Sequence, residues 1–439
     1  MAANLASYVR GTSPGDAPTG ALVPSDEVNE MANILASCVN TRGYTVGDKT
    51  PCDNLFSLAT PPGGTAPTNT FAAALDIAKH PGNNAALIAV LPTPQAPFPT
   101  SAGYVAPLDW TLAITFPIGP TVATNIAIDA GGDLWAVAPD GLYELSPTGV
   151  KQTSYSNLAG NTVAFDPSGN IWVALSGSSQ IAKMPANLST PAFFNVTTSG
   201  GGVGVGALAI DGSGNAWYTC PACTTVTEID TAGTVKAASP SNGGGLITTI
   251  LSIDPSENVW VGNITDSSFF VLQPNATLFP SEPFSCGSGC GRSAFIANDH
   301  AGQGWFIGNN LTLVSGVGGT ATSINSPSGG IFNPSAVAID GAGSAWVANT
   351  NSITSLTPDV PTTAGSISQF DTTGTAISPD TGYASNNLST PQSIAIDGSG
   401  NVWVRNTGTA TVTAFVGAAT PVVTPFSVGL ANGTLGQKP

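Results

Sequence analysis

Basic residues are scarce in this sequence. Ten lysines and arginines stand against 26 aspartates and glutamates, which gives a formal net charge of −16, and only two histidines are present. A protein that neutralises phosphate groups needs a basic patch, so we predict neither nucleic acid nor an anionic membrane surface as a partner. Charged residues make up 8% of the chain, and its polarity therefore comes mainly from serine, threonine and asparagine.

Long apolar runs are also missing. No stretch approaches the roughly 18 residues that cross a bilayer, so we expect no membrane span. The first residues, MAANLASYVRG, have neither the basic nor the apolar region of a signal peptide, and we expect no signal peptide within this chain. The 52 glycines and 35 prolines are typical of many short strands joined by tight turns, whereas 41% hydrophobic residues argue against disorder.

The six cysteines fall into three close pairs, which predicts disulfides and an oxidising compartment. The pairs are Cys38 with Cys52, Cys220 with Cys223, and Cys286 with Cys290. The alternative is a zinc site made by Cys220, Cys223, Cys286 and Cys290, because the spacings in CPAC and CGSGC suit tetrahedral ligation. The disulfide interpretation predicts an extracellular, cell-surface or periplasmic protein.

One nine-residue motif occurs seven times and always places a tryptophan six residues after an aspartate. The copies are AIDAGGDLW, AFDPSGNIW, AIDGSGNAW, SIDPSENVW, ANDHAGQGW, AIDGAGSAW and AIDGSGNVW, with the aspartates Asp129, Asp166, Asp211, Asp254, Asp299, Asp340 and Asp397. Intervals of 37 to 57 residues between them suit a four-stranded antiparallel sheet. Seven such units predict an all-β fold, a seven-bladed β-propeller.

Each motif is expected to fasten a hairpin. The aspartate accepts a hydrogen bond from the amide two residues on, and the glycine three residues on adopts the positive φ that ends the turn. The tryptophan then lies on the second strand with its ring between neighbouring sheets. This structural role is sufficient to account for each of the seven aspartates. The repetition of the motif therefore argues against a unique catalytic aspartate.

The remainder of the chain divides by composition. We predict a small helical segment over residues 1–90 with the Cys38–Cys52 pair, a Pro-rich linker over 91–109, and the propeller over 110–439. Helices are expected over 26–40 and 68–79, where apolar residues recur at helical spacing. The stretch DWTLAITF, which contains Trp110, is predicted to close the ring as an outer strand against the C-terminal PVVTPFSVG.

The repeat resembles the NHL-repeat and streptogramin-lyase-like (Vgb-like) β-propellers, whose repeats carry A-x-D-x-x-G-N, an aliphatic residue, Trp or Tyr, and V-A. The resemblance covers residues from about 110 to 439 and implies a propeller with a binding surface on one face. Streptogramin lyases depend on histidine, glutamate and a bound magnesium ion. Neither His80 nor His300 occupies a matching position, so no catalytic residue is assigned to this chain.

Candidate ligand-binding residues lie where the copies disagree. Asn298 replaces the isoleucine or phenylalanine that precedes the aspartate in the other six copies, and His300 lies in the same turn. Arg405 occupies a slot that mostly holds small or apolar residues, and an arginine there can bind a carboxylate or phosphate. We expect Arg405 and Arg292 to border one face together with both propeller Cys pairs. Gln392 begins an inner strand and can hydrogen-bond a polar ligand.

These observations predict a secreted binding or scaffold module that recognises a polar ligand, a glycan or a protein. Two alternatives stay open. One is a metal-dependent lyase or lactonase-type hydrolase that uses calcium, magnesium or zinc; the other is a structural surface or filament protein. No cofactor and no oligomeric state are predicted.

Overall fold

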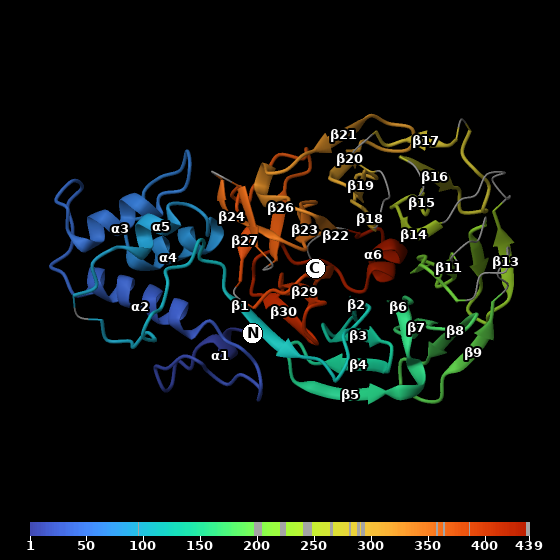
Figure 1. Cartoon of the computed structure of the whole chain (residues 1–439), viewed down its shortest axis with the longest axis horizontal. Helices are drawn as coiled ribbons and strands as arrows, with labels where there is room; N and C mark the ends of the chain where they lie inside the picture. Colours follow the sequence, from blue (N-terminus) through green and yellow to red (C-terminus); the bar gives the residue numbers. More distant parts are fainter. Residues whose placement is uncertain are drawn as a thin grey trace.

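Seven four-stranded antiparallel sheets surround a central channel (Figure 1), which confirms the predicted seven-bladed propeller with an N-terminal helical segment. The structure is a computed structural model. It describes residues 1–94, 96–196, 204–219, 225–239, 248–263, 267–280, 282–287, 290, 295–356, 359–362, 365–385 and 387–435.

Each blade runs from an inner strand at the channel to an outer strand at the rim. The inner strands are β2 (Asn125–Ile128), β6 (Gly160–Phe165), β10 (Leu208–Ile210), β14 (Thr248–Ile253), β18 (Phe295–Asn298), β22 (Pro334–Ile339) and β28 (Pro391–Ile396). The second strands, which carry the tryptophans, are β3 (Leu134–Ala138), β7 (Ile171–Leu175), β11 (Ala216–Tyr218), β15 (Val259–Asn263), β19 (Gly304–Ile307), β23 (Ala345–Asn349) and β29 (Val402–Asn406).

The two remaining strands of each blade follow in chain order, except in the last blade. The third strands are β4 (Gly141–Leu145), β8 (Gln180–Met184), β12 (Thr227–Ile229), β16 (Ser268–Leu272), β20 (Leu311–Val314), β26 (Ser366–Phe370) and β30 (Thr411–Phe415). The outer strands are β5 (Lys151–Tyr155), β9 (Ala192–Asn195), β13 (Val235–Ala238), β17 (Phe284–Ser285), β21 (Ala321–Ile324), β27 (Tyr383–Ala384) and β1 (Ala113–Pro117).

The seventh blade closes the ring with a strand from the other end of the propeller sequence. β1 pairs antiparallel with β30, with Ala113 opposite Phe415, so DWTLAITF does supply the predicted outer strand. The predicted partner was wrong, because β1 pairs with TVTAF and PVVTPFSVG crosses beneath the channel and enters helix α6 (Phe426–Asn432). Pro421 and Pro425 lack the N–H groups that an edge pairing needs.

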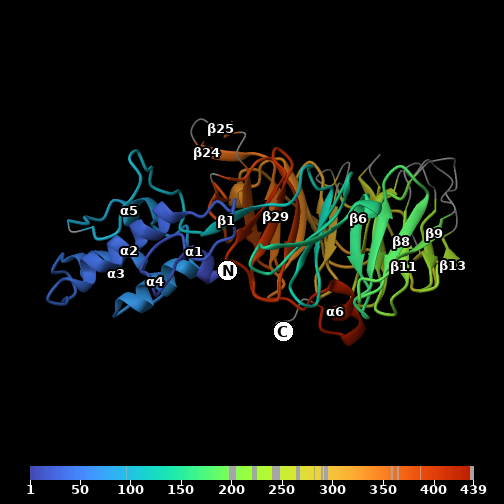
Figure 2. The ribbon, with the colours of Figure 1, turned by 90° about the horizontal axis from the view of Figure 1, so that it is seen from below.

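Blade six contains an inserted hairpin. β24 (Ser352–Leu356) and β25 (Asp359–Thr362) pair with each other between the second and third strands of this blade. Figure 2 shows the hairpin on the face opposite α6. This insertion accounts for the long interval between the sixth and seventh motif aspartates, which the repeat alone did not explain.

Five helices precede the propeller: α1 (Ala2–Leu5), α2 (Ser25–Val39), α3 (Pro51–Ala59), α4 (Thr70–Lys79) and α5 (Ala85–Ala89). α2 and α4 confirm the two predicted helices. α3 was missed although Thr50 caps it, accepting from the Asp53 amide, and Pro51 begins it. In the described part of the chain, no helix combines the length and apolar character needed to cross a bilayer.

The helices share a small core of their own. Ile34, Leu55, Phe56, Ile77 and Ile88 are buried in it together with Trp110, which immediately precedes the propeller. Residues of the Pro-rich stretch pack on α2, where the Asn33 side chain donates to the Phe98 carbonyl and accepts from its amide, both at 2.9 Å. The helical unit therefore packs against the chain segment that leads into β1.

The Cys38–Cys52 disulfide links α2 to α3, and its removal is expected to loosen this small core. Replacing both cysteines with serine should lower the free energy of unfolding of the helical unit by about 3 kcal/mol, the value for a closed loop of about 15 residues. Hydrogen exchange of α2 and α3 amides measures the effect. Amides of blade two serve as the internal control and should be unaffected, whereas unchanged exchange in α2 and α3 would contradict the prediction.

Candidate functional site

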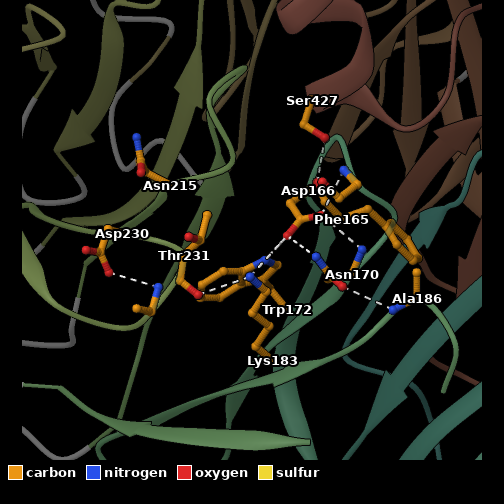
Figure 3. Close-up of polar contacts among 12 residues, drawn as sticks. Phe165, Asp166, Asn170, Trp172, Lys183, Ala186, Asn215, Asp230, Thr231 and Ser427 are labelled. Atoms are coloured by element: carbon orange, nitrogen blue, oxygen red, sulfur yellow. Dashed lines mark hydrogen bonds and ion pairs between the residues drawn. The ribbon is translucent and has the colours of Figure 1, made fainter. Parts of the chain in front are cut away.

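The repeated aspartate fastens both its turn and its tryptophan. In the second blade, Asp166 Oδ1 accepts from the Ser168 and Asn170 amides at 3.0 and 2.9 Å, as predicted for the turn. Asp166 Oδ2 accepts from the Asn170 side chain at 2.7 Å and from Trp172 Nε1 at 3.1 Å (Figure 3). The indole donates to the aspartate in all seven copies, at 2.8–3.3 Å. This bond explains the fixed Asp-to-Trp spacing.

The tryptophan rings are at most 2% exposed and lie between blades, as predicted. Lys183 strengthens one of these junctions. Its ammonium lies 4.8 Å above the Trp172 ring, 3.5 Å from Asp166 Oδ2 and 3.1 Å from the Thr231 carbonyl of the next blade (Figure 3). The hydrogen-bonding groups of the motif thus serve to hold the turn, the tryptophan and the neighbouring blade in place.

The glycine of the turn is replaced in one of the seven copies. Six copies carry a glycine with a φ near 80°, as predicted, but Glu257 adopts a φ of 63° in the fourth copy. Its carboxylate accepts from the Gly212 amide of the preceding blade at 3.2 and 3.3 Å. An inter-blade bond therefore accompanies the unfavourable backbone conformation.

Polar side chains at the beginnings of two inner strands join the first blade to the second and the sixth blade to the seventh. Thr124 Oγ1 donates to the Gly160 carbonyl at 2.8 Å, and Ser335 Oγ donates to the Pro391 carbonyl at 2.6 Å. The neighbouring blade therefore already uses these two hydroxyls. The reason is geometric, because the inner strands converge here and bring one blade's carbonyl within reach of the next blade's side chain.

Arg405 makes the corresponding connection where the ring closes. Its Nη1 donates to the carbonyl of Ala123 in the first blade, and its Nη2 donates to Gln392 Oε1 at 3.2 Å. The side chain is 7% exposed, and its Nε has no hydrogen-bond partner within the described part of the chain. Burial lowers the pKa of the guanidinium to about 10. The structure thus brings Arg405 and Gln392 together, whereas Arg292 lies outside the described residues.

Asn298 and His300 lie at the opposite end of the channel from this pair. His300 is exposed in the fifth Asp turn, beside Gly343 of the sixth. Asn298 is 2% exposed and contributes to the wall of the channel. The five predicted ligand residues therefore do not form one site, since the two described pairs occupy different ends of the propeller.

A cavity of about 310 Å³ occupies the channel at the Asp-turn end. Three consecutive residues of every inner strand line it: 126–128, 163–165, 208–210, 251–253, 296–298, 337–339 and 394–396. Most are alanine, isoleucine, leucine, valine or phenylalanine, and none of the described lining residues carries a charge. The cavity was not predicted from the sequence.

The C-terminal segment covers one side of this cavity. Residues 422–427 and Leu435 belong to the lining, and Figure 2 shows α6 on this face of the propeller. Ser427 Oγ donates to the Phe165 carbonyl at 2.6 Å (Figure 3), while the Thr420 amide donates to Asp340 Oδ2 at 3.2 Å. Leu430 packs in the same apolar cluster as Ile253. The segment is thus attached to three different blades.

Disulfides are confirmed for two of the three predicted pairs, Cys38–Cys52 and Cys286–Cys290. Cys220 and Cys223 lie outside the described residues. A structural zinc ion is bound by thiolates, and the sulfurs of Cys286 and Cys290 are instead bonded to each other, so the alternative four-cysteine site is not formed here. Within the described ranges, no group of three or more His, Cys, Asp or Glu side chains is arranged to hold a metal ion.

Two carboxyl groups with raised pKa values lie where the helical unit meets the propeller. Burial raises the pKa of Glu27 on α2 to about 7, and the nearby Asp109 and Asp26 raise it further. Burial also raises the pKa of Asp109 to about 6, although its carboxylate accepts hydrogen bonds from Thr111 and from the Ala384 amide at 2.9 Å. These bonds hold the segment before β1 against blade six.

Comparison with known proteins gives matches in structure alone. No protein-family model matches the chain, and no curated protein sequence matches it. Virginiamycin B lyase from Staphylococcus aureus superposes with a TM-score of 0.57 at 12% identity, over 69% of this chain and 98% of that protein. A streptogramin B lyase structure gives 0.56 at 13% identity, over 69% and 96%.

A third neighbour is not described as a lyase. It is the extracellular domain of a putative hybrid two-component system, BT3049, from B. thetaiotaomicron, with a TM-score of 0.53 at 17% identity over 72% of this chain and 46% of that one. At such identities a structural match establishes the fold alone. The chain therefore has the seven-bladed propeller fold of the streptogramin B lyases, as the resemblance of its repeats implied.

Proposed function

We propose that this chain is a secreted binding module whose ligand site is the channel cavity at the Asp-turn end. The observation that carries the proposal is the cavity itself, whose volume of about 310 Å³ falls at the lower end of the ~300–1,000 Å³ range of small-molecule sites. All seven blades contribute residues to its wall, and the C-terminal segment covers one side of it. A protein that served only as a scaffold or filament would not need this apolar space.

Hydrogen bonding elsewhere in the propeller also supports the channel cavity as the ligand site. The motif aspartates bond their own turns and tryptophans, and the polar groups at the opposite end bond between blades. Side chains around the cavity are apolar or uncharged, which suits burial of a ligand better than acid–base catalysis. Binding is therefore favoured over the lyase and hydrolase alternatives.

Secretion is part of the proposal. Two disulfides persist in an oxidising compartment and are rare in a reducing one. An acidic chain with few lysines and arginines is also suited to remaining soluble without binding nucleic acid. Mass spectrometry of the protein from its native source, with and without reductant, tests the disulfides there; fully reduced cysteines in that material would contradict secretion.

Narrowing the cavity is expected to weaken ligand binding. Ala338 lines the cavity, and Ala338→Leu should reduce the space for a probe such as 5-fluoroindole, whose ¹⁹F resonance reports binding. Gln392→Ala, at the far end of the channel, is the control and should bind the probe as the unaltered protein does. Loss of binding in Gln392→Ala with retention in Ala338→Leu, or absence of binding to the unaltered protein, would contradict the proposal.

A further inference from the structure

Two polar side chains of the inner strands in the channel cavity are departures from the repeat in neighbouring blades; the other polar side chains of the lining, Thr424 and Ser427, belong to the C-terminal segment. The residue before each motif aspartate is Asn298 in the fifth blade and is otherwise apolar: Ile128, Phe165, Ile210, Ile253, Ile339 and Ile396. The residue before that is Ser252 in the fourth blade and is otherwise alanine: Ala127, Ala164, Ala209, Ala297, Ala338 and Ala395. All fourteen residues line the cavity.

The strands that carry Ser252 and Asn298, β14 and β18, are adjacent inner strands, and Leu430 of α6 packs in the same apolar cluster as Ile253 of β14. Ser252 is 8% exposed and Asn298 is 2% exposed. One sector of an otherwise apolar ring therefore carries a hydroxyl and an amide. The remaining five blades present only apolar side chains at the same two positions.

The orientation of the Asn298 amide follows from its one hydrogen bond. Its Nδ2 donates to the Gln303 carbonyl at 3.3 Å. A carbonyl can only accept, so the amide nitrogen must face Gln303, and Oδ1 must face the other way. Oδ1 is buried and has no partner among the described residues.

A buried acceptor without a donor is unfavourable, and the six other blades avoid it by carrying isoleucine or phenylalanine. The turn does not need Asn298 in order to form. As in the other copies, the aspartate closes it: Asp299 Oδ1 accepts from the Ala301 and Gln303 amides at 2.9 Å. The Asn298 oxygen is thus an unused acceptor on a residue that lines the cavity. A ligand that donates one hydrogen bond would satisfy it.

We infer that the ligand of this cavity is an uncharged molecule with an apolar body and a single hydroxyl or N–H donor directed at Asn298 Oδ1; this inference rests on the function proposed above. The absence of charged side chains from the described lining leaves a charged ligand without a counter-ion. The volume of about 310 Å³ is roughly twice the ~150 Å³ cavity that holds benzene. Fused-ring phenols, indoles and alcohols of similar size meet these requirements.

A matched pair of probes tests the donor. 5-Fluoroindole carries one N–H, and 5-fluoro-1-methylindole lacks it while remaining apolar and similar in size. ¹⁹F NMR titration of the full chain should give a dissociation constant about tenfold lower for 5-fluoroindole, the factor expected for one hydrogen bond to a buried acceptor. In Asn298→Ile, which restores the residue of the other blades, the two constants should become equal. Asn298→Leu, closer to asparagine in shape, should behave in the same way.

The outcomes separate this inference from the proposed function. Equal affinity of the unaltered protein for both indoles would overturn the donor assignment and leave cavity binding intact. Binding of neither indole would overturn both. A tenfold preference that persists in Asn298→Ile and Asn298→Leu would show that another acceptor receives the N–H, and would overturn the role of Asn298. Because each preference is a ratio within one variant, a change in cavity size does not mimic the predicted result.

Discussion

Asp397→Ala is expected to lower the free energy of unfolding of the propeller by about 4 kcal/mol. Asp397 is 2% exposed and accepts from the Ser399 and Asn401 amides, the Asn401 side chain and Trp403 Nε1, at 2.7–2.9 Å. Alanine would leave these donors without an acceptor, and each buried unpaired group costs about 1–3 kcal/mol before relaxation. Denaturant unfolding followed by tryptophan fluorescence measures the change.

Asp371→Ala provides the matched control. Asp371 closes a similar turn, accepting from the Thr373 and Thr375 amides at 2.9 Å, but it is more exposed and bonds no tryptophan. Its replacement should cost about 1 kcal/mol, because water reaches the freed amides. Equal losses in the two variants would contradict the role assigned to the tryptophan bond. A stable Asp397→Ala protein would show that the repeated aspartate does not hold the blade.

The junction between the helical unit and the propeller is expected to weaken as the pH rises. In the folded protein the pKa of Glu27 is raised from 4.5 to about 7, and that of Asp109 from 3.8 to about 6. At a pH between the unfolded-state and the folded-state pKa of each group, the unfolded chain has lost a proton that the folded chain retains. Unfolding then releases protons, so stability falls with increasing pH. The decrease should extend from about pH 4 to about pH 7 and then level off.

Glu27→Gln should remove about half of this dependence, because the pKa of Asp109 is raised by its own burial. At pH 8 it should raise the free energy of unfolding of the helical unit by about 2 kcal/mol, because a neutral amide avoids the cost of a buried carboxylate. Glu30→Gln removes the same charge from the same helix and is the control. Hydrogen exchange of α2 amides at pH 5 and pH 8, corrected for intrinsic exchange, gives the comparison. An equal gain from both substitutions would assign the effect to net charge instead of burial.

Much of the fold could be predicted because the propeller repeats a local signal. Every Asp-to-Trp unit encodes one hairpin between the first two strands, and seven copies fix the number of blades. The outer strand of the last blade was also recognisable, since DWTLAITF precedes the first complete unit. Its partner was not, because the choice between TVTAF and PVVTPFSVG depends on which segment reaches the open edge of β30. That is a question of tertiary geometry.

The site was less predictable than the fold. Asn298 stood out because it differs from the residue in the other six copies, but the sequence could not show that its oxygen lacks a donor. Ser252 was missed, although it alone replaces alanine at its position. The cavity depends on how seven inner strands and the C-terminal segment leave space between them. Arg405 and Gln392 were predicted to bind a ligand, and that role stays a prediction. In the structure Arg405 bonds Ala123 across the ring closure, and Gln392 bonds Arg405 within the seventh blade.

The most direct test of the central claim is a crystal structure of the protein with 5-bromoindole, located by the anomalous scattering of bromine. The claim is that the ligand site lies where the blades differ, within the channel cavity. We predict one bromine peak between β14, β18 and α6, with the indole N–H within hydrogen-bonding distance of Asn298 Oδ1. A peak at the opposite end of the channel beside Gln392, or no ordered bromine in the channel, would contradict it.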